Sequence, residues 1–323
     1  MKTIAFILPH FGKLDVTGYF PLFLASCGEN QTVDFFVFTD DRTPYPYPPN
    51  VHVFYLTLEA LRERIQALYG FPVTLDRPYQ LCNFKIAYGE IFARELEGFD
   101  YWGYLDSDLI LGDIRHFVTE EMLERYHKIY THGHMTLYRN TLEVNTLYRQ
   151  PHPLTGCNTD YRRSLSSGEI DGIDEWGSGG GINGIFLYHR KQVYDVYDFD
   201  DVAADRRGFV CALKRHSPPY HSMQPCCYQY RSGHLYRHGL AYGGIFTSEV
   251  LYAHFQKRSM SCRPEELDPS AYLIVPDRFL PDQEITADFL TSLPKDGIRW
   301  PYFRWRVKNF IARRCRRLRH PSA

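Results

Sequence analysis

The sequence predicts an α/β fold in which helices flank a mostly parallel sheet, with a basic appendage at the C-terminus. Short apolar runs alternate with helical patterns over residues 1–113, which is typical of βαβ units and parallel strands. Nine Lys and Arg and no acidic residue occupy residues 299–323, whereas the whole chain has a net charge of −1. The 44% hydrophobic and 23% charged residues exclude a disordered chain.

The elements of the first half follow from local patterns in chain order. Apolar runs predict strands at Ile4–Leu8, Val33–Thr39, Val51–Tyr55 and Tyr101–Leu105. Helical spacing predicts one helix over 58–68, closed by Gly70, and another from Pro78 to about Leu96. Glycine and proline predict loops across 150–181, and Ile185–Tyr188 is expected to be a further strand.

Two aspartates follow the fourth predicted strand. Asp106 and Asp108 stand at i and i+2, and ligands of open α/β sheets bind beyond the carboxyl ends of strands. Two acids at such a place repel each other unless a cation lies between them, and Mn²⁺ or Mg²⁺ would also hold a diphosphate. The alternative is a turn in which both aspartates cap the next segment.

A late histidine and a glycine-rich loop carry the other candidate chemistry. Residues 253–260 (AHFQKRSM) contain His254, whose neutral imidazole suits Mn²⁺. The alternative is a half-buried histidine on a strand that is hydrogen-bonded to the backbone. Residues 174–184 (DEWGSGGGING) place Asp174 and Glu175 before glycines that permit close approach to a ligand. One of these acids would deprotonate a substrate hydroxyl, or both would position hydroxyl groups of a ligand. A glycine loop without a ligand is the alternative.

The order of these motifs resembles the GT-A glycosyltransferases, and in particular the retaining family-8 type that includes glycogenin and bacterial lipooligosaccharide galactosyltransferases. The succession LCNFKIAYGEIF, GYLDSDLILGDI, EWGSGGGINGIFLYHR and AHFQKRSM also resembles an uncharacterised bacterial polysaccharide-biosynthesis family. The resemblance implies a GT-A (Rossmann-like) fold and transfer of a hexose from a nucleotide diphosphate sugar, with UDP expected, to a saccharide acceptor. Capsule or other cell-surface polysaccharide synthesis is the implied setting.

The resemblance also implies roles for individual residues. Asp106, Asp108 and His254 would hold Mn²⁺ or Mg²⁺, and Lys257 would contact the diphosphate, with Arg258 as the alternative. The remaining donor-binding positions would be Pro9, His10, Phe11, Gly12, Asp40, Asp41, Lys85, Gly180, Gly181 and Asn183. A turn, a cap or a solvated lysine is the alternative at the first seven of these positions. Residues 1–290 would form the catalytic domain, with a nucleotide-binding half at 1–113 and an acceptor and donor-sugar half at 114–290, and residues 291–323 a tail.

The tail mixes aromatic residues with cations, and this predicts association with an anionic membrane surface. Without the nine bases of 299–323 the body retains 28 Lys and Arg against 38 Asp and Glu, about −10, which argues against a nucleic-acid partner. The N-terminus lacks signal-peptide features, and no CxxC pair occurs among the eight cysteines. We therefore expect a cytoplasmic protein, peripheral on the inner face of the membrane, that takes a saccharide acceptor in free or lipid-linked form.

Other interpretations remain open at this stage. A haloacid-dehalogenase-type phosphatase would use Asp106 as nucleophile and Asp108 as acid and base, and a nucleotidyltransferase would share the fold and the metal. A glycan- or membrane-binding scaffold without turnover is a third possibility. His132 and His134, two residues apart on one predicted strand, would point to one face, where a structural or substrate-facing role is favoured over a metal site.

Overall fold

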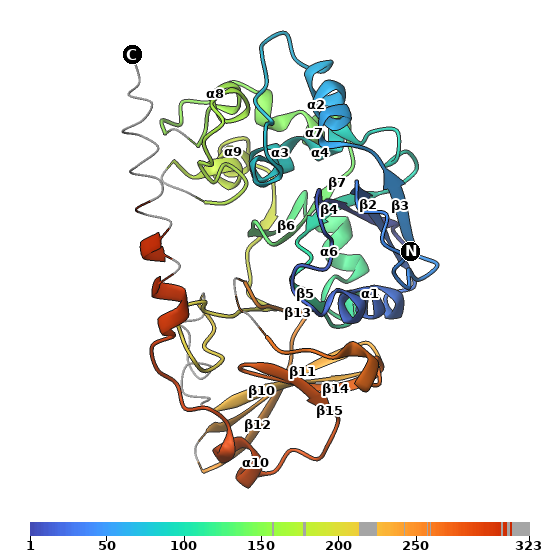
Figure 1. Cartoon of the computed structure of the whole chain (residues 1–323). Coiled ribbons are helices and arrows are strands. Elements are labelled where there is room, and N and C mark those ends of the chain that lie inside the picture. The colour runs from blue at the N-terminus through green and yellow to red at the C-terminus, as the bar shows by residue number, and fades with distance from the viewer. Residues whose placement is uncertain are drawn as a thin grey trace. The chain divides into compact units, whose positions relative to one another are not determined.

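The computed structural model describes residues 1–156, 158–176, 179–212, 225–241, 243–256, 258, 260–304, 306–308 and 311. The chain divides into two compact units (Figure 1). Unit 1 consists of Met1–Val16, Phe20–Ser107 and Asp113–Tyr197, and unit 2 of Thr17–Tyr19, Asp108–Gly112 and Asp198–Ala323. Each unit is described by itself.

Unit 1 contains a seven-stranded, mostly parallel sheet with the strand order β3-β2-β1-β4-β7-β6-β8. Its strands are β1 (Ile4–Pro9), β2 (Val33–Thr39), β3 (Val51–Tyr55), β4 (Tyr101–Leu105), β6 (Lys128–His132), β7 (Met135–Arg139) and β8 (Val193–Tyr194). β3, β2, β1 and β4 are mutually parallel, and β7 is antiparallel to β4 and β6. Every residue of β4 is buried, as expected for a central strand covered on both faces.

Helices of unit 1 connect and flank these strands. They are α1 (Phe20–Glu29), α2 (Leu58–Gln66), α3 (Leu81–Phe84), α4 (Tyr88–Ile91), α5 (Ile114–Phe117), α6 (Glu120–Arg125), α7 (Leu142–Asn145), α8 (Tyr161–Ser166) and α9 (Gly181–Tyr188). A single apolar cluster joins one face of the sheet to α2, α3, α4, α7 and α9. Its sheet side includes Ile7, Phe38 and Trp102, and its helix side includes Ile65 and Phe186.

The structure confirms the four strands predicted in the first half and the helix that follows the third. Val33–Thr39, Val51–Tyr55 and Tyr101–Leu105 have the predicted bounds, while β1 extends one residue further, to Pro9. The helix expected from Pro78 to Leu96 is instead a series of short turns. Two 3-10 segments, Pro78–Gln80 and Lys85–Ala87, alternate with α3 and α4.

Two other predictions of local structure are wrong. Ile185–Tyr188 was expected to be a strand, but it is the second half of α9, where Ile182, Ile185 and Phe186 share a buried face at helical spacing. A short apolar run does not distinguish a strand from a buried helix. His132 and His134 do not lie on one strand, because β6 ends at His132 and the turn Gly133–His134 leads into β7.

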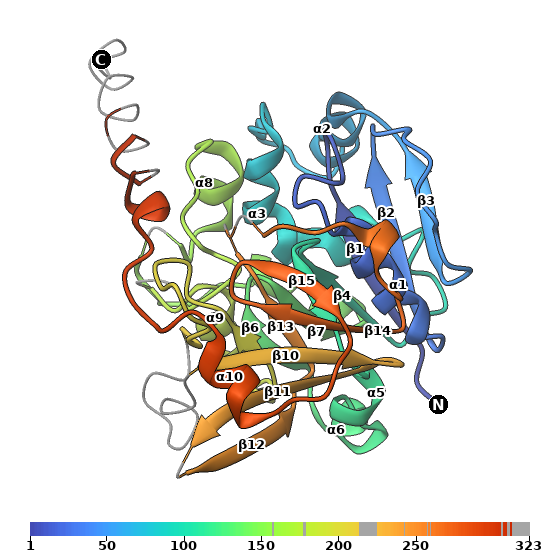
Figure 2. The same ribbon diagram turned by 60° about the horizontal axis from the view of Figure 1, so that its bottom comes forward.

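Unit 2 contains two sheets. The larger has the order β12-β11-β10-β14-β15 and is antiparallel throughout, as Figure 2 shows most clearly. Its strands are β10 (Cys226–Arg231), β11 (His234–Ala241), β12 (Gly244–Glu249), β14 (Ala271–Val275) and β15 (Arg278–Pro281). A 3-10 turn at Pro264–Glu266 precedes β14, and α10 (Ala287–Ser292) follows β15.

The smaller sheet of unit 2 has the order β5-β13-β9, with β5 (Leu109–Leu111), β13 (Tyr252–His254) and β9 (Asp200–Asp201). β13 is antiparallel to β5 and parallel to β9. This sheet places the residue after Asp108 opposite His254, because Leu109 pairs with His254. Among the residues described in the C-terminal tail, 300–304, 306–308 and 311 are helical, and the remaining tail positions lie outside the described chain.

Candidate functional site

The carboxyl ends of β1, β2 and β4 meet at one edge of the sheet in unit 1. β1 lies between β2 and β4, so the chain leaves β1 in one direction along the sheet and later returns on its other side. Ligands of open α/β sheets bind in the crevice at such a switch point. Asp106 directly follows β4, and His10 directly follows β1, so both predicted positions lie at this edge.

Asp40 and Asp41 hold the loop that follows β1. Asp40 Oδ1 accepts a hydrogen bond from Gly12 N at 2.7 Å, and Asp41 Oδ2 accepts one from Leu14 N at 2.9 Å. Hydrogen bonds from Thr43 and Leu14 lower the pKa of Asp41 to about 2. Both carboxylates therefore shape the backbone next to the switch point.

Lys85 is a buried cation that joins two sides of this edge. Its Nζ donates to Asp106 Oδ1 at 2.8 Å and to Gly133 O at 2.6 Å. Burial opposes the charge of the ammonium group, but the carboxylates of Asp106 and Asp174 outweigh it, and the pKa of Lys85 is well above its ordinary value. Lys85 thus supplies a fixed positive charge beside Asp106.

Asp174 and Glu175 reach the same turn from the glycine-rich loop. Glu175 Oε1 accepts a hydrogen bond from Gly133 N at 2.9 Å. A Cβ at position 133 would lie 2.5 Å from Glu175 Oε1 and 2.8 Å from Asp174 Oδ2, so any larger residue would have to displace these acids. Burial, partly offset by Lys85, raises the pKa of Asp174 to about 7. A carboxyl with this pKa is suited to accept or donate a proton near neutral pH.

The glycines of the loop serve the backbone itself. Gly180 and Gly181 have φ of +88° and +48°, and a Cβ on Gly181 would lie 2.0 Å from Glu175 O. The close approach is therefore between two segments of the chain, where a ligand was expected. Asn183 is fully buried and donates to Thr131 O at 2.9 Å, which ties α9 to β6. Two further residues of this loop, 177 and 178, lie outside the described chain.

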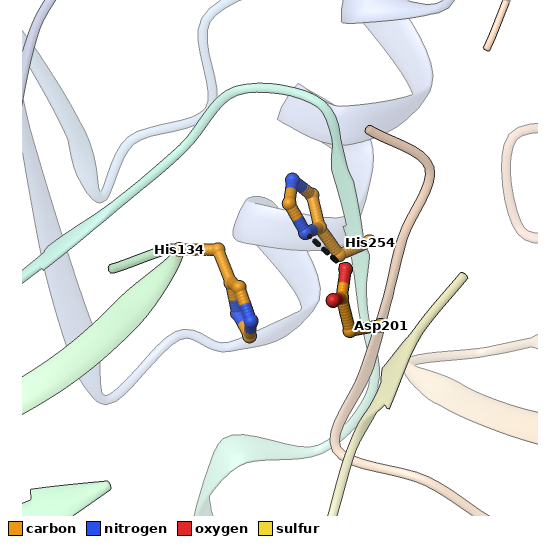
Figure 3. A group of neighbouring side chains, drawn as sticks. All are labelled: His134, Asp201 and His254. Atoms are coloured by element: carbon orange, nitrogen blue, oxygen red, sulfur yellow. Dashed lines mark hydrogen bonds and ion pairs between the residues drawn. The ribbon is translucent and has the colours of Figure 1, made fainter. Parts of the chain in front are cut away.

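In unit 2, Asp108 and His254 are in direct contact. Asp108 Oδ1 lies 3.2 Å from His254 Nε2, and Phe255 N donates to Asp108 O at 3.1 Å, beside the pairing of β5 with β13. The other ring nitrogen, Nδ1, lies 2.8 Å from Asp201 Oδ1 (Figure 3). Burial disfavours the imidazolium, but Asp108 and Asp201 outweigh it and raise the pKa of His254 to about 10. Two carboxylates around one imidazole favour positive charge at this place.

The structure describes one of the two residues expected to contact the diphosphate. Lys257 lies outside the described residues. Arg258 is buried, and its guanidinium donates to the backbone oxygens of Arg206, Arg207 and Gly208 at 2.8 to 3.1 Å. It therefore supports the loop at 206–208 in this structure.

The sequence analysis did not identify three residues that shape these sites. Gly133 is the turn at which Lys85 and Glu175 converge, and Asp201 and Gln256 contact each other beside His254. No local signal distinguishes Asp201 from the other acids of the chain, because its contact depends on β9 pairing with β13, 53 residues later. Gly133 had a weak signal, since a glycine between two apolar runs marks a turn.

No helix among the described residues is both long and apolar enough to span a bilayer.

Comparison with known proteins assigns the chain to a family. The curated proteins contain no match to this sequence. A family model matches residues 6–283, which is most of the chain. The protein therefore belongs to the DUF6625 family, whose description is a family of unknown function.

Proposed function

We propose that this protein is a metal-dependent glycosyltransferase that moves a hexose from a nucleotide diphosphate sugar, with UDP expected, to a saccharide acceptor. The observation that carries this proposal is the contact between Asp108 and His254 in unit 2, which the chain reaches three residues after the end of β4. A carboxylate and an imidazole at such a place suit a divalent cation that also holds a diphosphate.

The atoms of this pair fit a divalent cation. Two neighbouring ligands of an octahedral ion at about 2.1 Å lie about 3.0 Å apart. Asp108 Oδ1 and His254 Nε2 are separated by 3.2 Å, close to that value. The raised pKa of His254 has the same cause, since the two carboxylates around it favour a cation, whether a proton or a metal. Asp106 joins the proposed ligands because only Ser107 separates it from Asp108 in the chain.

A bound Mn²⁺ or Mg²⁺ would neutralise charge on the leaving diphosphate. The protein's own groups supply the remainder. Lys85 would present a positive charge beside the donor, next to Asp106. Asp174 would exchange a proton with the acceptor hydroxyl, since its pKa of about 7 suits that task and Glu175 is engaged with Gly133 N. Lys257 remains part of the proposal as a diphosphate contact on the basis of the motif.

The tail supports the proposed location of the enzyme. Trp300 and Phe303 are exposed three residues apart within the helical residues 300–304, and Val307 and Ile311 are exposed further along the described part of the tail. Arg304, Arg306 and Lys308 are exposed beside them. Apolar and basic residues so arranged suit an anionic membrane surface. We therefore place the enzyme peripherally on the cytoplasmic side of a membrane, acting on a lipid-linked or free saccharide in surface polysaccharide synthesis.

A thermal-shift experiment tests this function. Purified protein is heated with Mn²⁺ and UDP-, GDP-, CDP- or TDP-sugars, and the released sugar and nucleotide are measured in parallel. A ligand at a hundredfold excess over its Kd stabilises the folded state by about 2.7 kcal/mol. We expect a Mn²⁺-dependent increase in Tm with one class of donor, and its loss in Asp108→Asn and His254→Gln.

A matched histidine serves as the control. His234 Nδ1 lies 2.8 Å from Glu249 Oε1 in the large sheet of unit 2, so His234→Gln also removes a histidine–carboxylate pair. This variant should keep the full ligand-dependent increase in Tm. An unchanged increase in Asp108→Asn would contradict the metal assignment. The absence of any increase with every donor would contradict the glycosyltransferase.

A further inference from the structure

The short strand β9 directs two neighbouring aspartates to opposite sides. Consecutive side chains of a strand point to opposite faces. The carboxylate of Asp200 accepts from Tyr228 Oη at 2.9 Å and lies 3.4 Å from Arg237 Nη1, and all three side chains are buried. Asp200 thereby attaches β9 to β10 and β11. Asp201 points the other way, toward β13.

Asp201 holds the ring of His254 at one nitrogen. Asp201 Oδ1 lies 2.8 Å from His254 Nδ1 (Figure 3). A carboxylate oxygen accepts hydrogen bonds, so Nδ1 carries the hydrogen. The other ring nitrogen, Nε2, then faces Asp108 at 3.2 Å. Asp201 and His254 are only 6% and 7% exposed, which leaves the ring little freedom to rotate.

Asp201 is itself held by the backbone and by a second side chain. His254 pairs with Asp201 in the parallel register of β13 and β9, and Val202 N donates to His254 O at 3.0 Å. Gln256 Nε2 donates to Asp201 Oδ1 at 2.8 Å, so one oxygen receives both the imidazole and the amide. This oxygen is therefore committed to accepting hydrogen bonds.

We propose that Asp201 is a positioning residue of the metal site. It keeps the proton of His254 on Nδ1 and orients the ring, so that Nε2 is presented to a divalent cation of the Mn²⁺ and Mg²⁺ class. This proposal rests on the proposed function in one respect, namely a cation at Asp108 and His254. Loss of a carboxylate that receives the second N–H of a ligand histidine typically lowers metal affinity about 10- to 100-fold.

Mn²⁺ alone is the first probe. The affinity of the full-length protein for MnCl₂ is measured by electron paramagnetic resonance of free Mn²⁺. Asp201→Ala should bind 10- to 100-fold more weakly than the wild type. Asp201→Asn should stay close to the wild type, since Gln256 keeps the amide oxygen facing the ring. The double variant Asp201→Asn with Gln256→Leu should lose affinity, because the amide can rotate and donate to Nδ1.

A matched control separates positioning from general loss of stability. Asp282 directly follows β15, in the larger sheet of unit 2, and accepts from Gln229 Nε2 at 2.7 Å and from Arg231 Nε at 2.9 Å. Asp282→Ala therefore removes a comparable carboxylate and should keep the affinity for Mn²⁺. Equal Mn²⁺ affinity in Asp201→Ala and the wild type would overturn the proposal.

Proton NMR gives a second readout that needs no metal. A solvent-protected imidazole Nδ1–H signal should disappear in His254→Gln and in Asp201→Ala, and persist in Asp201→Asn and Asp282→Ala. If the signal persists in Asp201→Ala, the positioning role is overturned. If the signals follow the expected pattern and the wild type binds no Mn²⁺, the orientation of His254 by Asp201 is supported, and it is the metal of the proposed function that is contradicted.

Discussion

Two buried lysines of unit 1 show how local partners decide the charge of a residue. Lys85 faces the carboxylates of Asp106 and Asp174, and its pKa is well above the ordinary value despite burial. Lys128 is fully buried with Nζ donating to Tyr130 O at 2.7 Å and lying over the ring of Tyr138. Burial, only partly opposed by Asp195 and other acids, lowers the pKa of Lys128 to about 7. The pKa values of the two lysines therefore shift in opposite directions on folding.

The low pKa of Lys128 predicts a pH-dependent stability. Between pH 7 and the unfolded pKa of about 10.4, the unfolded chain binds a proton that the folded protein does not, so stability rises with pH in this window. Below pH 7 both states are protonated, and the full penalty of burying the ammonium applies. Lys128→Met should remove this dependence, so the Tm of the wild type should gain several degrees relative to the variant between pH 7 and 9.5. Scanning calorimetry measures both, and a constant difference in Tm would contradict the prediction.

At the level of single residues, the sequence indicates which side chains have suitable chemistry better than it indicates which residues are in contact. The end of the fourth predicted strand indicated Asp106 and Asp108, because acids that follow an apolar run are visible in the chain. Asp201 and Gln256 could not be predicted, because they acquire their role only when β9 and β13 pair. The hydrogen bonds that Asp40 and Asp41 accept from the loop after β1 could not be predicted from the sequence either, because both donors are backbone N–H groups.

At the level of elements, α9 shows why a short apolar run was assigned wrongly. Ile185–Tyr188 is apolar at every position, and four residues are too few to show whether the period is that of a strand or of a helix. The start of the helix is fixed at its N-terminus, where Gly180 and Gly181 adopt positive φ and Ile182 N donates to Ile173 O at 2.7 Å. The β1, β2 and β4 runs were predictable because each has seven residues or fewer and ends at, or directly before, a polar residue or proline.

The start of α9 predicts an asymmetry between two of its glycines. A Cβ on Gly181 would lie 2.0 Å from Glu175 O, and φ there is +48°, so Gly181→Ala should lower Tm by several degrees. Gly184 lies inside the same helix, and a Cβ there would meet Leu154 Cδ1 at 3.3 Å, the end of a flexible side chain. Alanine is favoured over glycine by about 1 kcal/mol in a helix interior. Gly184→Ala should therefore keep or raise Tm, and equal effects of the two substitutions on thermal unfolding would contradict this account.

At the level of the whole molecule, charge is distributed unevenly along the chain. The antiparallel sheet of unit 2 was not predicted, because His, Tyr, Pro and Arg obscure alternation in residues 213–240. The basic end of the chain was evident from composition alone. The segment before the tail helix is attached to unit 2, since Arg206 pairs with Asp296 and Arg299 N donates to Asp205 O at 2.9 Å. The helical segment from residue 300 therefore starts from an anchored point.

The composition of the tail predicts binding to anionic membranes that depends on both its exposed apolar residues and its charge. Trp300, Phe303 and Val307 are 66%, 37% and 57% exposed, and burying such side chains in the interface contributes about 1.5 to 3 kcal/mol each at most. Each base near an anionic surface adds about 1 kcal/mol, and salt screens it. A triple variant, Trp300→Ser, Phe303→Ser and Val307→Ser, keeps every charge and should bind vesicles containing phosphatidylserine at least tenfold more weakly in sedimentation assays.

The control for this experiment is an apolar residue that is equally accessible elsewhere. Leu142, in α7 of unit 1, is 80% exposed, and Leu142→Ser should leave vesicle binding unchanged. Binding of the wild type should also fall as salt rises and be weak on vesicles of neutral lipid, because the apolar face and the cations act together. If the triple variant binds as tightly as the wild type, charge alone holds the protein at the surface. If the wild type does not bind anionic vesicles, the tail has a different partner, and the acceptor need not be lipid-linked.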